Sequence, residues 1–379
     1  MGLYDGQSLD PSALKELRIL VLHNRDFATS PQDDAADIPL DELSRADVAN
    51  AARSIARALA ARGHFAEAQG IDRDDVADLM QRLRHDPPDL VFNIVESMGG
   101  DDRHGAVIPT LLDLLEIPYT GAGPMCQNVV LRKHFTSQVL RAAGIPTPPS
   151  VLLPSKTQAR SDDLAATGTI GYPLFLKLEE TDGSVGVSNS SLVQTDEELV
   201  RQVAYLRDRY SQPILAERFI AGREVYVSML GNSPARLLPM QEIDFSKLPR
   251  TFPHIVNENA KWKAGTPEYA AISSVVARPL PSPVRERIEQ VVRRTFEILE
   301  VRDYGRCDIR LAADGTPYVI DVNSNCDLSE GAGYVRSAEL AGMAYDQLIE
   351  QIAIVALQRS AHVQRQRTQT RHRSTGSTG

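Results

Sequence analysis

The chain of 379 residues is 42% hydrophobic and 24% charged, proportions typical of a globular protein long enough for about two or three domains. Its net charge of −9 argues against a nucleic-acid binder, and no apolar run approaches the ~20 residues that a membrane span needs. Scattered cysteines and an N-terminus without a secretory signal favour a cytoplasmic protein with no disulfide framework and no zinc site.

Strands and helices alternate along residues 1–122, which predicts an α/β fold whose N-terminal domain contains a mainly parallel, Rossmann-like sheet. Apolar runs predict strands at 17–23, 89–95 and 117–123, and helical periodicity predicts helices at 44–63, 72–84 and 105–116. Ligands bind at the carboxyl ends of parallel strands. We therefore count His23, Asn24, Arg25 and Glu96 among the candidates for a substrate surface.

Further elements are predicted along residues 123–358. Helices are expected at 128–144, from Thr195, at 281–300 and at 345–359, and strands at 172–180, 191–194, 213–220 and 223–231. Glu198 is the predicted N3 carboxylate of a capping box. Residues 359–379 combine several arginines with few apolar residues, so they predict a disordered tail, with a nucleic-acid arm as the alternative.

A glycine loop at residues 182–188 joins two of these strands. Its small residues allow backbone N–H groups to approach an anion, and the Ser184 hydroxyl adds a donor. Lys177 lies between leucines on the strand that enters the loop, where burial requires an anionic partner. A flexible hairpin and an edge-strand lysine that reaches water are the alternatives, and Lys133 is compatible with a solvated position on its helix.

The segment 305–325 predicts a hairpin with its turn at 313–315. Arg306 and Asp308 on one strand, and Asp321 and Asn323 on the other, stand two residues apart, so each pair points to one face. Carboxylate and amide oxygens suit Mg²⁺, which completes its coordination shell with water and phosphates. An arginine–aspartate ion pair would explain only two of the four residues, which favours a metal site.

Taken in order, these motifs resemble those of ATP-grasp enzymes, and specifically those of the D-alanine–D-alanine ligase family, over residues 91–357. The similar stretches are the segment up to Lys133, GYPLFLKLEETDGSVGVS, PILAERFIAGREVYVSMLGN, NENAKW and GRCDIRLAADGTPYVIDVNSN. The resemblance implies a two-part ATP-grasp fold after the Rossmann-like domain, with a central subdomain at 123–216 and a C-terminal domain at 217–358. The family often dimerises, so a homodimer is compatible with it.

The resemblance also implies roles for individual residues. ATP would be bound by Lys133, Lys177, Gly183, Ser184, Val185, Gly186, Glu217, Glu224 and Lys261, and two Mg²⁺ ions, with Mn²⁺ as an alternative, by Asp308, Asp321 and Asn323. Arg306, Lys261 and Ser184 would be catalytic. In the implied reaction a substrate carboxylate attacks the γ-phosphate to form an acyl phosphate, and an amine then displaces phosphate.

The sequence departs from the family pattern mainly on the substrate side. The N-terminal substrate motif has no counterpart at 20–32, Trp262 replaces a tyrosine, Asp321 replaces a glutamate, and SNCDLSEGAGYVR stands where the family has a Pro-Gly pair. We therefore expect a carboxylate–amine ligase for small amino-acid-like substrates other than two D-alanines, with candidate specificity residues Arg25, Glu96, Asp327 and Arg336. The alternatives are a D-alanine–D-alanine ligase and a non-ligating ATP-binding regulatory protein of the same fold.

Overall fold

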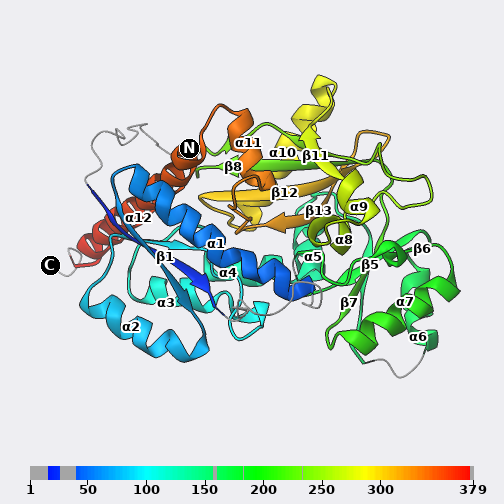
Figure 1. The fold of residues 1–379 in the computed structure, drawn as a ribbon, viewed down its shortest axis with the longest axis horizontal. Coiled ribbons are helices and arrows are strands. Elements are labelled where there is room, and N and C mark those ends of the chain that lie inside the picture. Colours follow the sequence, from blue (N-terminus) through cyan, green and yellow to red (C-terminus); the bar gives the residue numbers. More distant parts are fainter. Residues whose placement is uncertain (1–15, 26–39, 157–159, 182, 233, 376–379) are drawn as a thin grey trace.

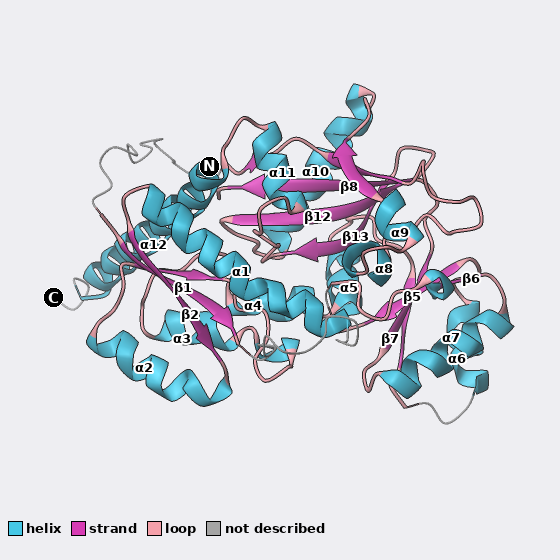
Figure 2. Cartoon of the chain, in the orientation of Figure 1, coloured by secondary structure: helices cyan, strands magenta, loops and turns pink. Residues whose placement is uncertain are grey.

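Three β-sheets frame the part of the chain that the computed structural model describes, which is residues 16–25, 40–156, 160–181, 183–232 and 234–375 (Figures 1 and 2). Most of the stretch 20–32, in which a substrate motif was sought, lies outside these residues. The sheets follow one another along the chain, and helices from distant parts of the sequence cover them.

The N-terminal sheet is parallel, with strand order β2-β1-β3. In β1, Ile19 and Val21 pack into one core while Leu20 and Leu22 pack into another, because successive side chains of a strand point to opposite faces. The predicted α/β class with a parallel N-terminal sheet is confirmed. The elements of this region are β1 (Arg18–Asn24), α1 (Leu40–Ala61), β2 (Phe65–Ile71), η2 (Arg73–Asp75), α2 (Val76–His85), β3 (Leu90–Asn93), η3 (Asp102–His104) and α3 (Val107–Leu114).

The second sheet is antiparallel, in the order β4-β7-β5-β6. Helix α7 begins after Thr195, whose hydroxyl accepts from Glu198 N at 3.2 Å; the Glu198 carboxylate accepts from Gln194 N rather than completing the predicted capping box. The elements are α4 (Pro124–Leu131), α5 (Lys133–Ala142), β4 (Ser150–Leu153), α6 (Arg160–Gly168), β5 (Leu174–Leu178), η4 (Asn189–Ser191), β6 (Leu192–Val193), α7 (Asp196–Arg209) and β7 (Ile214–Arg218).

The third sheet has the order β11-β10-β8-β12-β13, with β9 beside β8. Its short strands β9 to β11 and helices α8 and α9 were not predicted, because each spans only two to five residues, too few for a hydrophobic period to show. The elements are β8 (Arg223–Leu230), β9 (Arg236–Leu237), β10 (Gln241–Asp244), α8 (Glu258–Trp262), α9 (Pro267–Ala271), β11 (Ser273–Val276), α10 (Ser282–Ile298), β12 (Tyr304–Leu311), β13 (Pro317–Asn323), α11 (Gly333–Leu340) and α12 (Tyr345–Thr375).

The predicted hairpin is confirmed as β12 and β13. Its register sets Arg306 opposite Asn323 and Asp308 opposite Asp321, so the four polar side chains fall at adjacent positions of the sheet. The turn depends on Gly315, whose φ of +80° lies in the left-handed region that glycine adopts without strain.

Two predictions about helices are wrong in detail. The helix expected at 128–144 is broken at Arg132, whose ψ of 87° is not helical, so Lys133 begins a new helix. Helix α12 continues to Thr375 instead of giving way to a disordered tail at 359. At the position where the tail was predicted to begin, Arg359 anchors the helix to the rest of the fold. Its guanidinium donates to both oxygens of buried Asp303 at 2.9 Å and to Tyr119 O at 2.7 Å.

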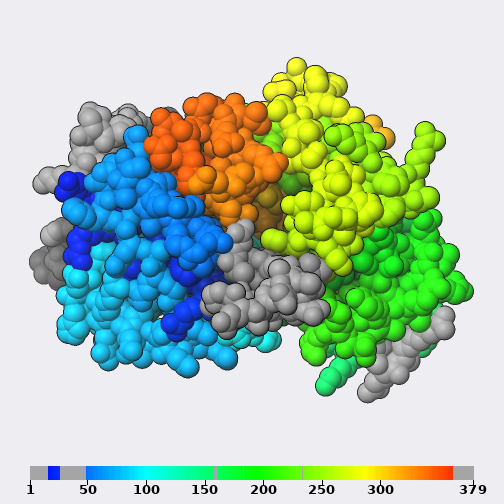
Figure 3. Space-filling view, in the orientation of Figure 1, coloured from blue at the N-terminus to red at the C-terminus, as the bar shows by residue number. Residues whose placement is uncertain are grey.

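Helix α12 joins the two ends of the chain. Ile349 and Ile352 of α12 are fully buried in one core with Ile55 and Leu59 of α1, and Figure 3 shows the blue α1 segment beside the orange segment that contains α11.

Among the described residues, only the sharply bent pair α11–α12 has the combined length and apolar composition of a membrane span, and no single helix does. The three cysteines, Cys126, Cys307 and Cys326, are free and buried. The domain boundaries themselves stay a proposal.

Candidate nucleotide site

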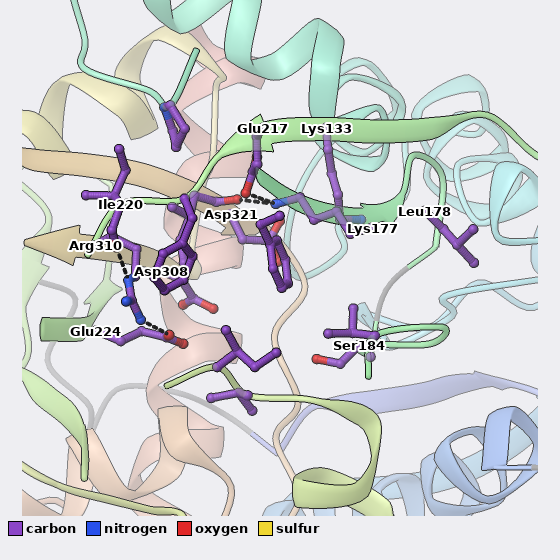
Figure 4. Close-up of a pocket in the computed structure, with 18 of the residues that line it drawn as sticks. Lys133, Lys177, Leu178, Ser184, Glu217, Ile220, Glu224, Asp308, Arg310 and Asp321 are labelled. Atoms are coloured by element: carbon purple, nitrogen blue, oxygen red, sulfur yellow. Dashed lines mark hydrogen bonds and ion pairs between the residues drawn. The ribbon is translucent and has the colours of Figure 1, made fainter. Parts of the chain in front are cut away.

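A pocket of about 910 Å³, partly open to solvent, is lined by residues of the second and third sheets and of the loops beside them (Figure 4). Apolar side chains such as Phe175 and Ile255 line it together with charged ones. Gly186 and Arg306 are not among the lining residues, but each adjoins one that is. Most of the residues predicted to bind nucleotide or metal meet here: Lys133, Lys177, Gly183, Ser184, Val185, Glu217, Glu224, Lys261, Asp308, Asp321 and Asn323.

Lys177 lies on β5 opposite Leu215 of β7, and its side chain is largely buried, so the alternative of a lysine that reaches water is wrong. Its Nζ is 3.2 Å from a carboxylate oxygen of Glu217 on β7 and donates to Ile320 O at 3.0 Å (Figure 4). The two charged side chains are only 11% and 10% exposed. Burial raises the pKa of Glu217, and the charge of Lys177 opposes that rise. The lysine therefore has the anionic partner that its position between leucines requires.

The other pocket lysines, Lys133 and Lys261, place positive charge near Asp321 of the hairpin. Lys133, at the start of α5, donates from Nζ to Thr181 O at 2.8 Å, where the glycine loop begins. Burial alone would raise the pKa of Asp321, but the charges of Lys133, Lys177 and Lys261 lower it below its ordinary value. Asp321 is therefore ionised at neutral pH and lies among cations, an arrangement that attracts phosphates and metal ions to the same place.

The glycine loop has a defined backbone conformation. Gly183, Ser184 and Gly186 have φ values of +72°, +63° and +74°. A serine in this region costs on the order of 1–3 kcal/mol, and such strain is found most often in ligand-binding segments. Since Ser184 lines the pocket, this geometry favours the anion-binding interpretation over a plain flexible hairpin.

Helix α8 is bound to the glycine loop by three hydrogen bonds. Gly186 N donates to the Glu258 carboxylate at 3.1 Å, Glu258 N donates to Val187 O at 3.0 Å, and Trp262 Nε1 donates to Gly183 O at 2.9 Å. These bonds connect segments more than 70 residues apart, since Gly186 and Glu258 are separated by 72. The loop and α8 therefore form one cover over the pocket.

Replacing Trp262 with phenylalanine should weaken ATP binding about fivefold, because one hydrogen bond of about 1 kcal/mol that holds this cover is lost. Calorimetric titration with ATP would measure the change. Tyr269→Phe is the matched control, since Tyr269 is 47% exposed and does not line the pocket. An unchanged ATP affinity in Trp262→Phe would contradict the expectation.

Sequence reasoning missed two residues that hold Glu224. Tyr226 OH donates to Glu224 Oε1 at 2.9 Å, and Arg310 Nη1 lies 3.0 Å from Glu224 Oε2 (Figure 4). Both follow a predicted residue by two positions, Tyr226 after Glu224 on β8 and Arg310 after Asp308 on β12. The alternation that identified Asp308 would have identified Arg310 too, had it been continued along the strand.

On the hairpin, Arg306 donates from Nε and Nη2 to the Asp308 carboxylate at 2.6 and 2.8 Å, and Asn323 Nδ2 lies 3.5 Å from Asp308 Oδ2. The Arg306–Asp308 ion pair, considered above as an alternative to a metal site, is therefore present together with the oxygen atoms that could bind a metal. No group of three His, Cys, Asp or Glu side chains suited to a metal occurs in the described residues. The donor set of Asp308, Asp321 and the Asn323 amide nevertheless fits Mg²⁺, which takes few carboxylates and relies on water and phosphates for the rest.

Glu179, next to the pocket, is 4% exposed, and both its carboxylate oxygens accept from His134 N, at 3.0 and 2.9 Å. Burial raises the pKa of Glu179 to about 7, against the influence of that N–H and of Lys133 and Lys177. Between pH 4.5, its ordinary pKa, and pH 7 the folded protein keeps a proton that the unfolded chain releases. This group therefore lowers the stability of the fold as pH rises through that window.

Glu179→Gln should remove this dependence. Relative to wild type, the variant should gain up to about 3 kcal/mol in the free energy of unfolding between pH 5 and pH 8, because 1.36 kcal/mol corresponds to each pKa unit. Urea unfolding at several pH values would measure the gain. Parallel pH profiles for the two proteins would contradict it.

The structure does not bring the predicted substrate residues into this pocket. Arg25 pairs with Asp75 at 2.8 Å, and Arg336 donates to Gly331 O at 2.5 Å, so both are engaged at the surface. Glu96 and Asp327 are exposed, but each lies close enough to Tyr304 to raise its pKa, after burial as the main cause. Their charges therefore act on the same buried hydroxyl, one from the N-terminal region and one from the segment after the hairpin.

The family model described as D-ala D-ala ligase C-terminus matches residues 139–354. The chain is 30% identical over 280 residues to the uncharacterised protein y4sG of Sinorhizobium fredii, covering 72% of this chain and 78% of that one. It is 27% identical over 286 residues to a D-alanine–D-alanine ligase of Pelotomaculum thermopropionicum, covering 74% and 84%.

Solved structures share the fold. The D-alanine–D-alanine ligase of Bacillus anthracis in complex with ATP superposes with a TM-score of 0.68 at 21% identity, covering 92% of this chain and 99% of that one. The Coxiella burnetii D-alanine–D-alanine ligase gives a TM-score of 0.69 at 19% identity, covering 96% and 100%.

Proposed function

Because the chain belongs to the D-alanine–D-alanine ligase family of ATP-grasp enzymes, we propose that it is a carboxylate–amine ligase driven by ATP, with amino-acid-like substrates other than two D-alanines. One observation carries the proposal: a pocket with a full set of cations and carboxylates for a triphosphate lies beside a segment, residues 324–332, that departs from the family pattern. The residues on the nucleotide side match the family pattern, whereas those on the substrate side differ from it.

On the nucleotide side, Lys133, Lys177 and Lys261 supply fixed positive charge to the phosphates, and the backbone around Ser184 supplies N–H donors. Glu217 and Glu224 would contact the adenine end and the ribose hydroxyls. Apolar walls give the base a dry surface. Charged side chains for the phosphates and ribose, together with apolar side chains for the base, support the proposal that the pocket binds ATP.

Asp308, Asp321 and Asn323 would hold two Mg²⁺ ions, with Mn²⁺ as an alternative. When bound, the metal would neutralise charge on the phosphates during transfer. Arg306, held by Asp308, would stabilise the transferred phosphoryl group or the oxyanion formed when the amine attacks. The cover formed by α8 and the glycine loop would exclude water from the acyl phosphate.

The substrate side is proposed to lie at the junction of the N-terminal sheet and the hairpin. Among the described residues, the Tyr304 hydroxyl and both polar side-chain atoms of Asn325 are buried without a hydrogen-bond partner. A Cβ at Gly121 would lie 2.4 Å from Asn325 Oδ1 and 3.4 Å from Tyr304 Cε1, so both side chains lie beside Gly121. A buried polar group left unsatisfied costs about 1–3 kcal/mol. A polar substrate group that reaches this junction would satisfy them.

The test is to incubate the protein with ATP, Mg²⁺ and a panel of L- and D-amino acids and small carboxylates, and to follow ADP and coupled products by mass spectrometry. A new amide product other than D-alanyl-D-alanine supports the proposal. Efficient D-alanyl-D-alanine formation would instead show a D-alanine–D-alanine ligase. ATP binding without substrate-stimulated ADP release across the panel would favour the regulatory alternative.

A further inference from the structure

We propose that Arg310 fixes the orientation of Glu224 and so makes the pocket select nucleotides with an intact ribose over deoxyribonucleotides. The inference rests on the proposed nucleotide role of the pocket. Arg310 acts on the ligand through Glu224, which makes it a positioning residue. No part of the resemblance to the family assigns it a role.

Arg310 is held from four directions in the interior. It is 4% exposed, and besides Glu224 it donates from Nε to Ile220 O at 2.9 Å and from Nη1 to His254 O at 3.1 Å. Its guanidinium carbon lies 4.8 Å above the ring centre of Phe219. A planar guanidinium fixed in this way has little rotational freedom left to lose, so its position is set before any ligand arrives.

These contacts join separate parts of the pocket wall. Phe219 and Ile220 belong to the connection between β7 and β8, while His254 belongs to the segment that leads to α8. Glu224 lies on β8 directly opposite Arg310 in the register of the sheet. Arg310 therefore ties the turn between two strands, the segment before the cover and the carboxylate proposed to face the ribose into one rigid unit.

The carboxylate of Glu224 receives one protein donor on each oxygen. Tyr226 OH occupies Oε1 and Arg310 occupies Oε2, which leaves each oxygen a further lone pair. Glu224 is 6% exposed and lines the pocket, so those lone pairs can be satisfied only from the pocket side. A carboxylate restrained at both oxygens can accept from vicinal ribose hydroxyls without first losing conformational freedom.

The pocket would select against a deoxyribonucleotide because that ligand lacks a hydroxyl from which Glu224 would accept a hydrogen bond. A site built to hydrogen-bond a hydroxyl rejects an analogue that lacks it, because a buried acceptor then stays unsatisfied. A hydrogen bond to a charged group contributes about 1.5–3 kcal/mol, which corresponds to about 10- to 100-fold in affinity. Without Arg310, the Glu224 carboxylate can rotate away from the ribose, and the difference in affinity between the two ligands should shrink.

The experiment is calorimetric titration of the full chain with Mg²⁺ and ATP, 2′-deoxy-ATP or 3′-deoxy-ATP. Wild type should bind ATP at least about 10-fold more tightly than one of the two analogues, and Arg310→Met should reduce that ratio to about 3 or less. Arg223→Met is the matched control. Arg223 lies on β8, the strand that pairs with the strand of Arg310, and it too contacts a carboxylate, that of Glu242, at 3.0 and 2.7 Å, but neither residue lines the pocket.

The outcomes separate the two proposals. Failure of wild type to bind ATP would overturn the proposed function and this inference with it. ATP binding without discrimination in wild type, or with the same ratio in Arg310→Met as in wild type, would overturn the inference alone. If Arg310→Met does not fold, Arg310→Lys decides: it keeps the charge but loses the planar fork, so its ratio should fall at least about threefold, and an unchanged ratio overturns the inference.

Discussion

Replacing Lys177 with methionine is expected to weaken ATP binding by at least about 100-fold, since a charge-assisted contact of about 3 kcal/mol with the phosphates is lost. Lys177 is largely enclosed by protein, with an exposed fraction of 11% and partners on two sheets, Glu217 on β7 and Ile320 on β13. Calorimetric titration with ATP and Mg²⁺ would measure the loss. An affinity within a few-fold of wild type would show that Lys177 serves the fold alone.

A second variant separates binding from folding. Lys177→Met leaves Glu217 buried without its ion pair, which should lower the free energy of unfolding by up to about 3 kcal/mol. The double variant Lys177→Met/Glu217→Gln removes that stranded carboxylate and should regain most of the stability while ATP binding stays weak. Lys247→Met, at an exposed position outside the pocket, should change neither quantity.

Replacing Asp321 with asparagine is expected to reduce metal-dependent turnover about 1000-fold. The substitution keeps the shape of the side chain and removes one negative charge from the proposed metal site, and a metal supplies several kcal/mol of charge stabilisation during phosphoryl transfer. ADP formation with an accepted substrate pair, titrated with Mg²⁺ and with Mn²⁺, would measure it. Turnover within tenfold of wild type at saturating metal would contradict the assignment.

The same hairpin supplies the control for Asp321. Asp314 lies in the turn, exposed, where its carboxylate accepts from Thr316 N at 2.9 Å. Asp314→Asn keeps an acceptor there and should leave metal dependence unchanged. Thermal unfolding of both variants would show whether the Asp321 effect is separate from stability.

Local patterns predicted much of the molecule because they depend on neighbours in sequence. Alternation along each strand of the hairpin placed Arg306 with Asp308 and Asp321 with Asn323, and the register sets the two pairs opposite each other. A lysine between leucines required a buried anion, and Glu217 is that anion. In each case one residue's chemistry, together with the period of a strand, limits where its partner can be.

Long-range pairs were missed for the opposite reason. The bond between Arg310 and Glu224 joins residues 86 apart, and Arg359 meets Asp303 across 56 residues. Nothing in the sequence around Arg310 indicated its partner, and the composition around Arg359 predicted a tail. The break at Arg132 depends on how the chain turns into α5, which helical periodicity does not encode. The four candidate substrate residues were chosen because they lie near predicted strand ends and loops. Position in the sequence does not determine which pocket such residues face.

The shared core of α1 and α12 has a consequence for how the chain folds as it is made. Arg62 and Glu350, bonded at 2.8 Å, are 288 residues apart, and the apolar side chains beside them bury one another. When β1 and α1 leave the ribosome, the helix that completes their core has not been synthesised. The core that this face of the parallel sheet shares with α1 and α12 therefore stays incomplete until α12 has been made, so β1 and α1 reach their final packing late.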